Sequence, residues 1–154
     1  MDIYIQFIFG SPHYDRITLG QASVSQTTNG RRETMQHDKL FIIQADFADG
    51  EPNQNFYCPG CAEILGLFKY YPQLESKVEI CYVPFQRPRP SIVDLIGADN
   101  QGCPVLVLAP GSTSANSAAQ LQNAGGHYFT NDLREIGIYL SETYGIGFPY
   151  PPKA

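Results

Sequence analysis

Cys58 and Cys61 are the two residues of this sequence whose type and spacing most clearly point to chemistry. They stand in the segment Tyr57-Cys58-Pro59-Gly60-Cys61, which follows a polar loop and precedes apolar residues that recur with helical spacing. This pattern predicts a helix that begins at Cys58, with Pro59 in its first turn, where the missing N–H costs nothing. Cys58 would therefore lie at a helix N-terminus, whose partial positive charge stabilises a thiolate.

The second thiol of the pair supplies the rest of a redox centre. Cys61 lies one helical turn beyond Cys58 and could close a disulfide after Cys58 has attacked a substrate. Two cysteines with this spacing, behind a strand and at the start of a helix, indicate either a redox dithiol or half of a metal site. Cys81 is predicted to be a small core residue within a strand.

Length and charge restrict the possible functions. A chain of 154 residues suits one domain with a hydrophobic core. The net charge is −5, and the arginines form only two short pairs, so nucleic-acid binding is not expected. The N-terminus shows no basic region followed by a long apolar run, so neither an export signal nor a membrane segment is expected. We therefore expect the thiols to work in a reducing cytoplasm.

The sequence divides into three parts. Residues 1–37 lack a regular pattern and are predicted to be a flexible extension. Alternatively, Met35 is the natural start, and the residues before it come from a start codon assigned too far upstream. Residues 38–147 form the predicted domain, and residues 148–154 form a Pro-rich tail.

Within the domain, short apolar runs alternate with helical patterns. Strands are predicted at residues 39–44, 77–85, 105–108 and 127–129. Helices are predicted at residues 58–71 and 91–96. A last helix is predicted from Asn131, its cap, to Gly145. Residues 109–126 are predicted to be an exposed loop with one helical turn near residues 118–121. This order predicts an α/β fold with a four-stranded mixed sheet and helices on both faces, in which the first two strands are parallel.

The motifs resemble those of the thioredoxin superfamily, and specifically of its glutaredoxin-like branch. The Cys58–Cys61 segment resembles the Cys-Pro-x-Cys centre of glutaredoxins, and Cys103-Pro104 resembles the superfamily's cis-proline element. A closer resemblance is to a bacterial thioredoxin-like family catalogued as a domain of unknown function. That resemblance rests on Asp46-Phe47, Phe56-Tyr57-Cys58-Pro59, Arg87-Pro88-Arg89, Asn100-Gln101 and Pro104-Val105-Leu106-Val107. It implies a thioredoxin-like fold.

The resemblance also implies roles for residues. Cys58 would be the nucleophile and Cys61 the resolving thiol of a thiol–disulfide oxidoreductase. No tightly bound cofactor is implied, and the partner would be glutathione, or a protein or low-molecular-weight disulfide. The residues expected to contact it are Tyr57, Pro59, Arg87, Arg89, Cys103, Pro104, Thr130 and Asn131.

Two other functions stay open. The chain could be a non-enzymatic binding module with a vestigial dithiol. Alternatively, Cys58, Cys61 and Cys103 could bind zinc or an iron–sulfur cluster, with His127 or an external thiol completing the site. Arg87 and Arg89 could equally be a plain solvated turn.

Overall fold

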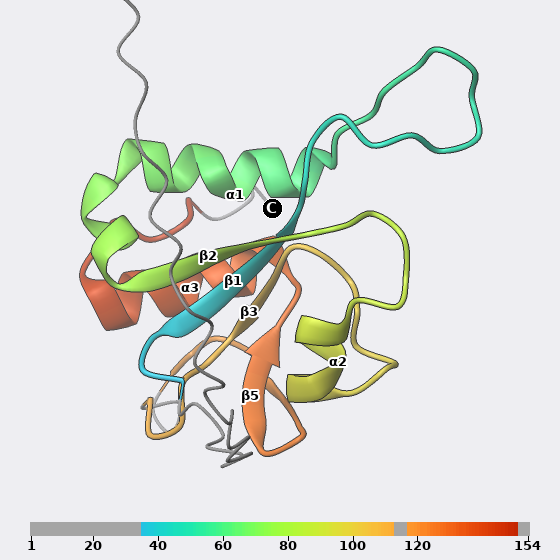
Figure 1. The fold of residues 1–154 in the computed structure, drawn as a ribbon. Coiled ribbons are helices and arrows are strands. Elements are labelled where there is room, and N and C mark those ends of the chain that lie inside the picture. Colours follow the sequence, from blue (N-terminus) through green and yellow to red (C-terminus); the bar gives the residue numbers. More distant parts are fainter. Residues whose placement is uncertain (1–34, 113–116, 151–154) are drawn as a thin grey trace, which may run out of the picture. The chain divides into compact units, whose positions relative to one another are not determined.

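Within residues 35–112 and 117–150, the chain forms a mixed five-stranded sheet in the order β2-β1-β3-β5-β4, with three α-helices packed against it (Figure 1). The computed structural model describes residues 35–112 and 117–150. The strands are β1 (Asp38–Ile43), β2 (Val78–Val83), β3 (Val105–Val107), β4 (Gln122–Ala124) and β5 (His127–Thr130). The helices are α1 (Pro59–Tyr70), α2 (Pro90–Ile96) and α3 (Leu133–Tyr144), and a short 3-10 helix, η1 (Pro72–Ser76), follows α1.

The connections agree with the predicted α/β class, but one strand was missed. β1 and β2 are parallel and are joined through α1, whereas β3 is antiparallel to both β1 and β5. The predicted count of four strands is wrong, because Gln122–Ala124 pairs with β5 as an edge strand. This segment was predicted to be loop because its side chains are polar and largely exposed. Backbone pairing across a tight turn, rather than apolar burial, forms the strand.

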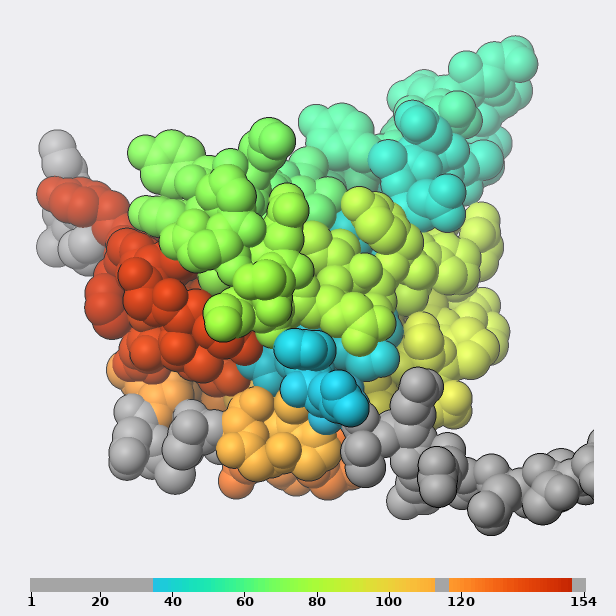
Figure 2. All heavy atoms as spheres, turned by 60° about the vertical axis from the view of Figure 1, so that its left-hand side comes forward, coloured from blue at the N-terminus to red at the C-terminus, as the bar shows by residue number. Residues whose placement is uncertain are grey.

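Alternating side chains of β1 divide the core into two layers. Leu40 and Ile42 pack in the cluster that contains residues of α1 and α3, whereas Phe41 packs in the cluster that contains residues of α2. The predicted placement of helices on both faces of the sheet is therefore confirmed. Figure 2 shows α1 in green and α3 in red, which lie next to each other on one flank.

A buried carboxylate ties α3 to the sheet. Asp38, only 2% exposed at the start of β1, accepts hydrogen bonds from the hydroxyls of Tyr139 (2.7 Å) and Tyr144 (2.8 Å). It also accepts bonds from the Ala109 backbone N–H and the Ser112 hydroxyl, both at 2.8 Å. All four donors are therefore satisfied by one side chain, which is the condition under which a carboxylate can be buried.

The start of α3 corrects one predicted cap. Asp132, rather than Asn131, is the N-cap, and its carboxylate accepts hydrogen bonds from the backbone N–H groups of Arg134 and Glu135. Asp and Asn are about equally good caps, so composition alone could not choose between neighbours. Gly145 ends the helix in the left-handed conformation, as predicted.

Gly125, in the turn between β4 and β5, offers a stability test. A Cβ there would lie 1.9 Å from the carbonyl oxygen of Leu95 in α2, and its φ is +59°. Gly125→Ala is therefore expected to lower the free energy of unfolding by about 2–3 kcal/mol. Gly126→Ala is the matched control, because φ is +84° there but no atom lies within 4 Å of the added Cβ. Urea unfolding of both variants should show the larger loss at Gly125, and equal losses would contradict the close packing of the turn on α2.

No helix in the described part of the chain is long and apolar enough to cross a bilayer. The prediction for residues 1–37 falls almost entirely outside the described residues, as does the end of the tail at residues 151–154. The hypothesis that Met35 is the natural start stays a prediction.

Candidate functional site

The candidate site is built around the first turn of α1. Cys58 is the N-cap, in an extended conformation, and Pro59 occupies the first helical position, as predicted. The backbone N–H of Cys61 donates to the Sγ of Cys58 at 3.4 Å. An N–H that would otherwise have no partner in the helix therefore points at the sulfur of Cys58.

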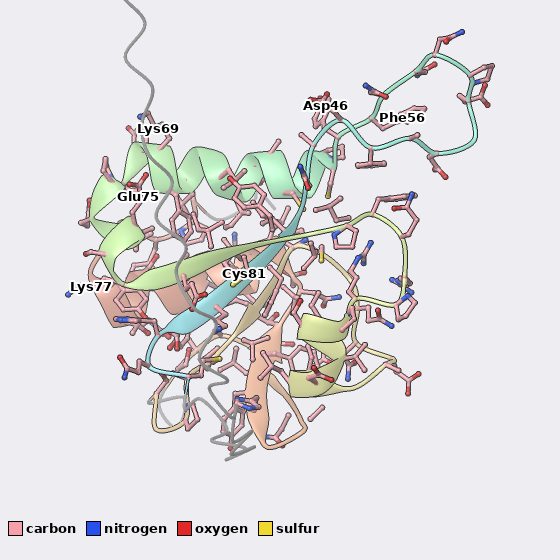
Figure 3. All side chains as sticks on the ribbon, in the orientation of Figure 1. Asp46, Phe56, Lys69, Glu75, Lys77 and Cys81 are labelled. Carbon is pink, nitrogen blue, oxygen red and sulfur yellow. The ribbon has the colours of Figure 1, made fainter. Side chains whose placement is uncertain are left out.

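The loop that leads into α1 is fixed at its base. Phe47 and Phe56 exchange two backbone hydrogen bonds, of 3.1 and 2.8 Å, so residues 48–55 form a closed excursion. Figure 3 shows Asp46 and Phe56 where the excursion leaves and rejoins the domain. The rings of Phe47 and Phe85 stack with centroids 4.1 Å apart. These contacts anchor the backbone just before Tyr57, whose side chain is 64% exposed beside the thiols.

Cys61 is shielded from solvent. Its side chain is 3% exposed, and the backbone N–H of Ile43, at the end of β1, donates to its Sγ at 3.3 Å. Burial, followed by the side-chain hydrogen bond that the Cys61 thiol makes to Cys58, raises the pKa of Cys61 to about 12. The two cysteines thus differ in character: Cys58 is half-buried and Cys61 is protected.

The segment before β3 lies against the dithiol. The Sγ of Cys58 is 3.9 Å from the carbonyl oxygen of Cys103, and the Cys103–Pro104 peptide bond is cis. Gly60 permits this approach, because a Cβ at that position would lie 3.2 Å from the Cδ of Pro104. Residues 45 positions apart in the sequence are therefore brought together as expected.

The two arginines have different surroundings. Arg89 is 4% exposed, and its guanidinium donates to the carbonyl oxygens of Pro84, Phe85 and Gln101. It has no carboxylate partner among the described residues, in which Lys39–Glu79 is the only ion pair. Arg87 is exposed and its peptide bond to Pro88 is cis. Arg87 is therefore the more accessible of the two to a ligand, whereas Arg89 is largely bound within the protein.

A cavity of about 570 Å³ lies beside these residues. It is lined by Ile43, Phe85, Gln86, Arg87, Arg89, Gly102 and Cys103. It joins both arginines to the segment that contacts Cys58, and no Asp or Glu lines it. An anionic group would meet a positive potential there, because neither cation is neutralised by a carboxylate of the cavity wall.

Of the two polar residues before α3 that were predicted to contact a substrate, one is buried and the other is exposed. Thr130 is 2% exposed, and its Oγ1 accepts a hydrogen bond from the Asp132 backbone N–H at 3.3 Å. Asn131 is exposed, and its Nδ2 would lie 2.9 Å from a Cβ placed on Gly102. Asn131 therefore lies over the same backbone segment as Cys103, whereas Thr130 is turned inward.

The described residues do not gather as a metal site would require. No group of three or more His, Cys, Asp or Glu side chains in residues 35–112 and 117–150 converges with metal-binding geometry. His127 starts β5, and its Nδ1 lies 3.3 Å from the carbonyl oxygen of Leu108. In the antiparallel pairing it is Thr130, three residues further on, that lies opposite Leu106, nearer to Cys103. His127 is thus at the wrong end of the strand to complete a site with the thiols.

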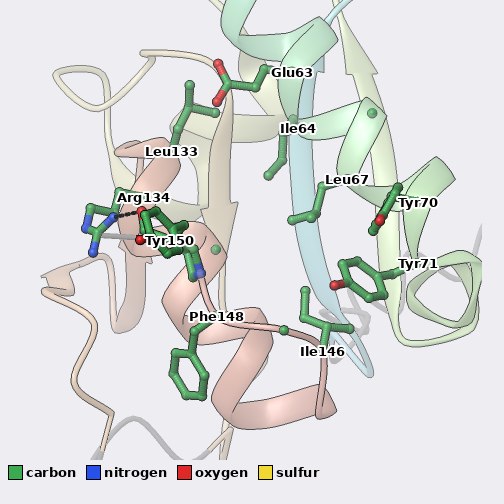
Figure 4. Close-up of a pocket in the computed structure, with 14 residues that line it drawn as sticks. Glu63, Ile64, Leu67, Tyr70, Tyr71, Leu133, Arg134, Ile146, Phe148 and Tyr150 are labelled. Atoms are coloured by element: carbon green, nitrogen blue, oxygen red, sulfur yellow. Dashed lines mark hydrogen bonds between the residues drawn. The ribbon is translucent and has the colours of Figure 1, made fainter. Parts of the chain in front are cut away.

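The structure reveals two features that sequence reasoning missed. The side-chain oxygen of Gln101 accepts a hydrogen bond from the Arg89 backbone N–H at 2.6 Å, which joins the Arg87–Arg89 loop to the Cys103 segment. A larger cavity, of about 680 Å³, lies between α1, α3 and residues 146–150 (Figure 4). Leu67, Tyr71 and Ile146 are among the residues that line it, and no cysteine does. Neither feature has a sequence signal, because each depends on contacts between distant segments.

The comparisons with known proteins identify the family of the chain. The fold and the thiol pair define an α/β protein with a dithiol at a helix N-terminus. Residues 37–148 match the model of the family described as "Protein of unknown function (DUF3088)", and the chain belongs to that family. This confirms the resemblance to an uncharacterised family. Searches of curated proteins and of solved structures gave no match.

Proposed function

We propose that this protein is a thiol–disulfide oxidoreductase with a thioredoxin-like fold. The observation that carries the proposal is the Sγ of Cys58, which accepts the Cys61 N–H at the tip of α1 and lies 3.9 Å from the backbone of Cys103. The fold assignment is supported by the parallel pair of β1 and β2 joined through α1, an antiparallel β3 that follows a cis-proline, and a closing α3. A reducing compartment such as the cytoplasm would keep the dithiol ready to react.

The reaction would be two successive exchanges. The thiolate of Cys58 attacks one sulfur of a substrate disulfide, forms a mixed disulfide, and expels the other sulfur as a thiolate. Cys61 then loses its proton and attacks the Cys58 sulfur, which releases the second substrate thiol and leaves a Cys58–Cys61 disulfide. Two molecules of glutathione would restore the dithiol and leave as glutathione disulfide.

Several groups around the thiols suit glutathione or an extended peptide disulfide. The backbone of Cys103, held beside Cys58 by Pro104, could pair with an extended substrate chain. Arg87 borders the same cavity as Cys103, Asn131 lies over Gly102, and both are exposed and could bind a carboxylate of the substrate. Arg89 and Thr130 would act by holding the backbone in place, because their own polar groups are already bonded within the protein.

Equilibration in glutathione buffers tests the proposal. The reduced protein is brought to equilibrium at a series of ratios of glutathione to glutathione disulfide, quenched with acid, alkylated and mapped by mass spectrometry. We expect one intramolecular disulfide, between Cys58 and Cys61, that forms and disappears reversibly along the series. A chain in which both thiols stay reduced across the series, or in which Cys81 alone carries glutathione, would contradict the proposal and favour a non-enzymatic binding module.

A further inference from the structure

Three of the four cysteines share one end of the fold. Cys58 and Cys61 open α1, and Cys103 lies at the start of β3, where its carbonyl oxygen is 3.9 Å from the Cys58 sulfur. Cys103 is half-buried and borders the 570 Å³ cavity, so its sulfur can be approached from that side. Cys81 is on β2, at the edge of the sheet, paired with Phe41 in the middle of β1. Figure 3 shows it on the strand, away from the tip of α1.

The surroundings of Cys61 make it a slow resolving thiol. It is almost fully buried and accepts a hydrogen bond from the Ile43 N–H, and burial raises its pKa to about 12. Little of it is therefore in the thiolate form near neutral pH, and thiolate is the form that attacks a disulfide. A mixed disulfide at Cys58 would wait for Cys61 to lose its proton.

Cys103 has a different electrostatic environment. Burial raises the pKa of Cys103 above its ordinary value, and the positive charges of Arg89 and Arg87 offset part of that rise. Arg89 is buried, without a carboxylate partner in the described part of the chain, so its charge is weakly screened. A thiolate on Cys103 would supply negative charge near Arg89, and the positive charge of Arg89 would in turn favour that thiolate.

We propose that Cys103 is a second resolving thiol, which can displace the substrate from Cys58 in place of Cys61. The inference rests on the proposed function. In this step the Cys103 thiolate attacks the Cys58 sulfur of the mixed disulfide, a Cys58–Cys103 bond forms, the bond to the substrate breaks, and the substrate leaves as a thiolate. The oxidant is the substrate disulfide itself. The Cys58 sulfur already lies 3.9 Å from the carbonyl oxygen of Cys103, so the two residues are neighbours before any reaction.

The reaction of Cys61→Ser with glutathione disulfide tests this proposal. We expect the variant to release bound glutathione and to form a disulfide that peptide mapping assigns to Cys58 and Cys103. Cys61→Ser/Cys103→Ser should stop at one glutathione on Cys58, and its release of glutathione should be at least about tenfold slower. Cys61→Ser/Cys81→Ser is the matched control and should behave like Cys61→Ser. Cys61→Ala, which places no hydroxyl in the buried position, repeats the test independently.

The outcomes separate the two proposals. If Cys61→Ser and Cys61→Ala keep glutathione on Cys58 while Cys103 remains reduced, the role of Cys103 is overturned and the proposed function stands. If Cys58 takes up no glutathione in any of these variants, both proposals are overturned. Fast release of glutathione from Cys61→Ser/Cys103→Ser, with a disulfide between Cys58 and another cysteine of the protein, would also overturn the role of Cys103.

Discussion

Replacing Cys58 with serine is expected to lower the rate of glutathione-dependent disulfide reduction by at least about 100-fold. A serine hydroxyl at the tip of α1 could still accept the Cys61 N–H, so the local structure should persist, but it cannot form a disulfide with a substrate. The measurement is a coupled assay in which a small disulfide is reduced and the glutathione disulfide formed is followed.

Cys81→Ser is the control for the Cys58 variant. Cys81 is the cysteine outside the cluster, and its pKa is raised to about 11 by burial and then by the charge of Glu79. Its replacement should leave the rate within about twofold of the wild-type rate. If the Cys58 and Cys81 variants were equally active, or if the wild-type chain did not reduce the disulfide, the oxidoreductase proposal would be wrong.

The largest expected effect on stability is at Asp38. Asp38→Ala removes the acceptor of four hydrogen bonds, and the donors left without it are the buried Tyr139 and the partly buried Tyr144, Ala109 and Ser112. We expect the free energy of unfolding to fall by roughly 4 kcal/mol, because each buried donor without a partner costs about 1–3 kcal/mol and water can replace only some of them. Urea or thermal unfolding measures the loss.

Asp38→Asn and pH provide the controls. The asparagine keeps the shape and one acceptor oxygen, so its cost should be about 1–2 kcal/mol. Burial raises the pKa of Tyr139, and its hydrogen bond to Asp38 raises it further. A folded pKa above the unfolded value of about 10 means that this stabilisation is complete below about pH 10 and is lost as pH rises further. That alkaline loss should be smaller in Asp38→Ala. Equal stability of the alanine variant and the wild-type chain would contradict the network.

Local patterns predicted much of the fold, and pairings between distant segments account for the rest. The apolar run of β1 and the stripe of α1 point into the core, so sequence periodicity found both elements. β4 was missed because its residues, Gln122–Ala124, are held by backbone pairing with β5 and carry little apolar signal. The cap of α3 was placed one residue early because Asn131 and Asp132 are both good capping residues.

The part of the candidate site that is formed by residues adjacent in the sequence could be predicted. The Cys-Pro-Gly-Cys segment specified Cys58 and the N-terminus of α1, and the resemblance brought Cys103-Pro104 to it. The burial of Arg89 could not be foreseen, because it depends on carbonyl oxygens of Pro84, Phe85 and Gln101 that meet only in the folded chain. For the same reason, sequence reasoning could not separate the exposed Arg87 from the enclosed Arg89.

Competitive alkylation of the reduced, folded protein tests the central claim most directly. A sub-stoichiometric amount of iodoacetamide at pH 7, followed by peptide mapping, gives the relative rate at each cysteine, and the same treatment in urea gives the rates in the unfolded chain. We expect Cys58 to react at least about tenfold faster in the folded protein than in urea, because its half-buried sulfur lies at the tip of α1 and accepts the Cys61 N–H. We also expect Cys61, with its pKa raised to about 12 by burial, to stay unmodified in the folded state. A Cys58 that reacts no faster folded than unfolded, or a Cys61 that is alkylated first, would contradict the central claim.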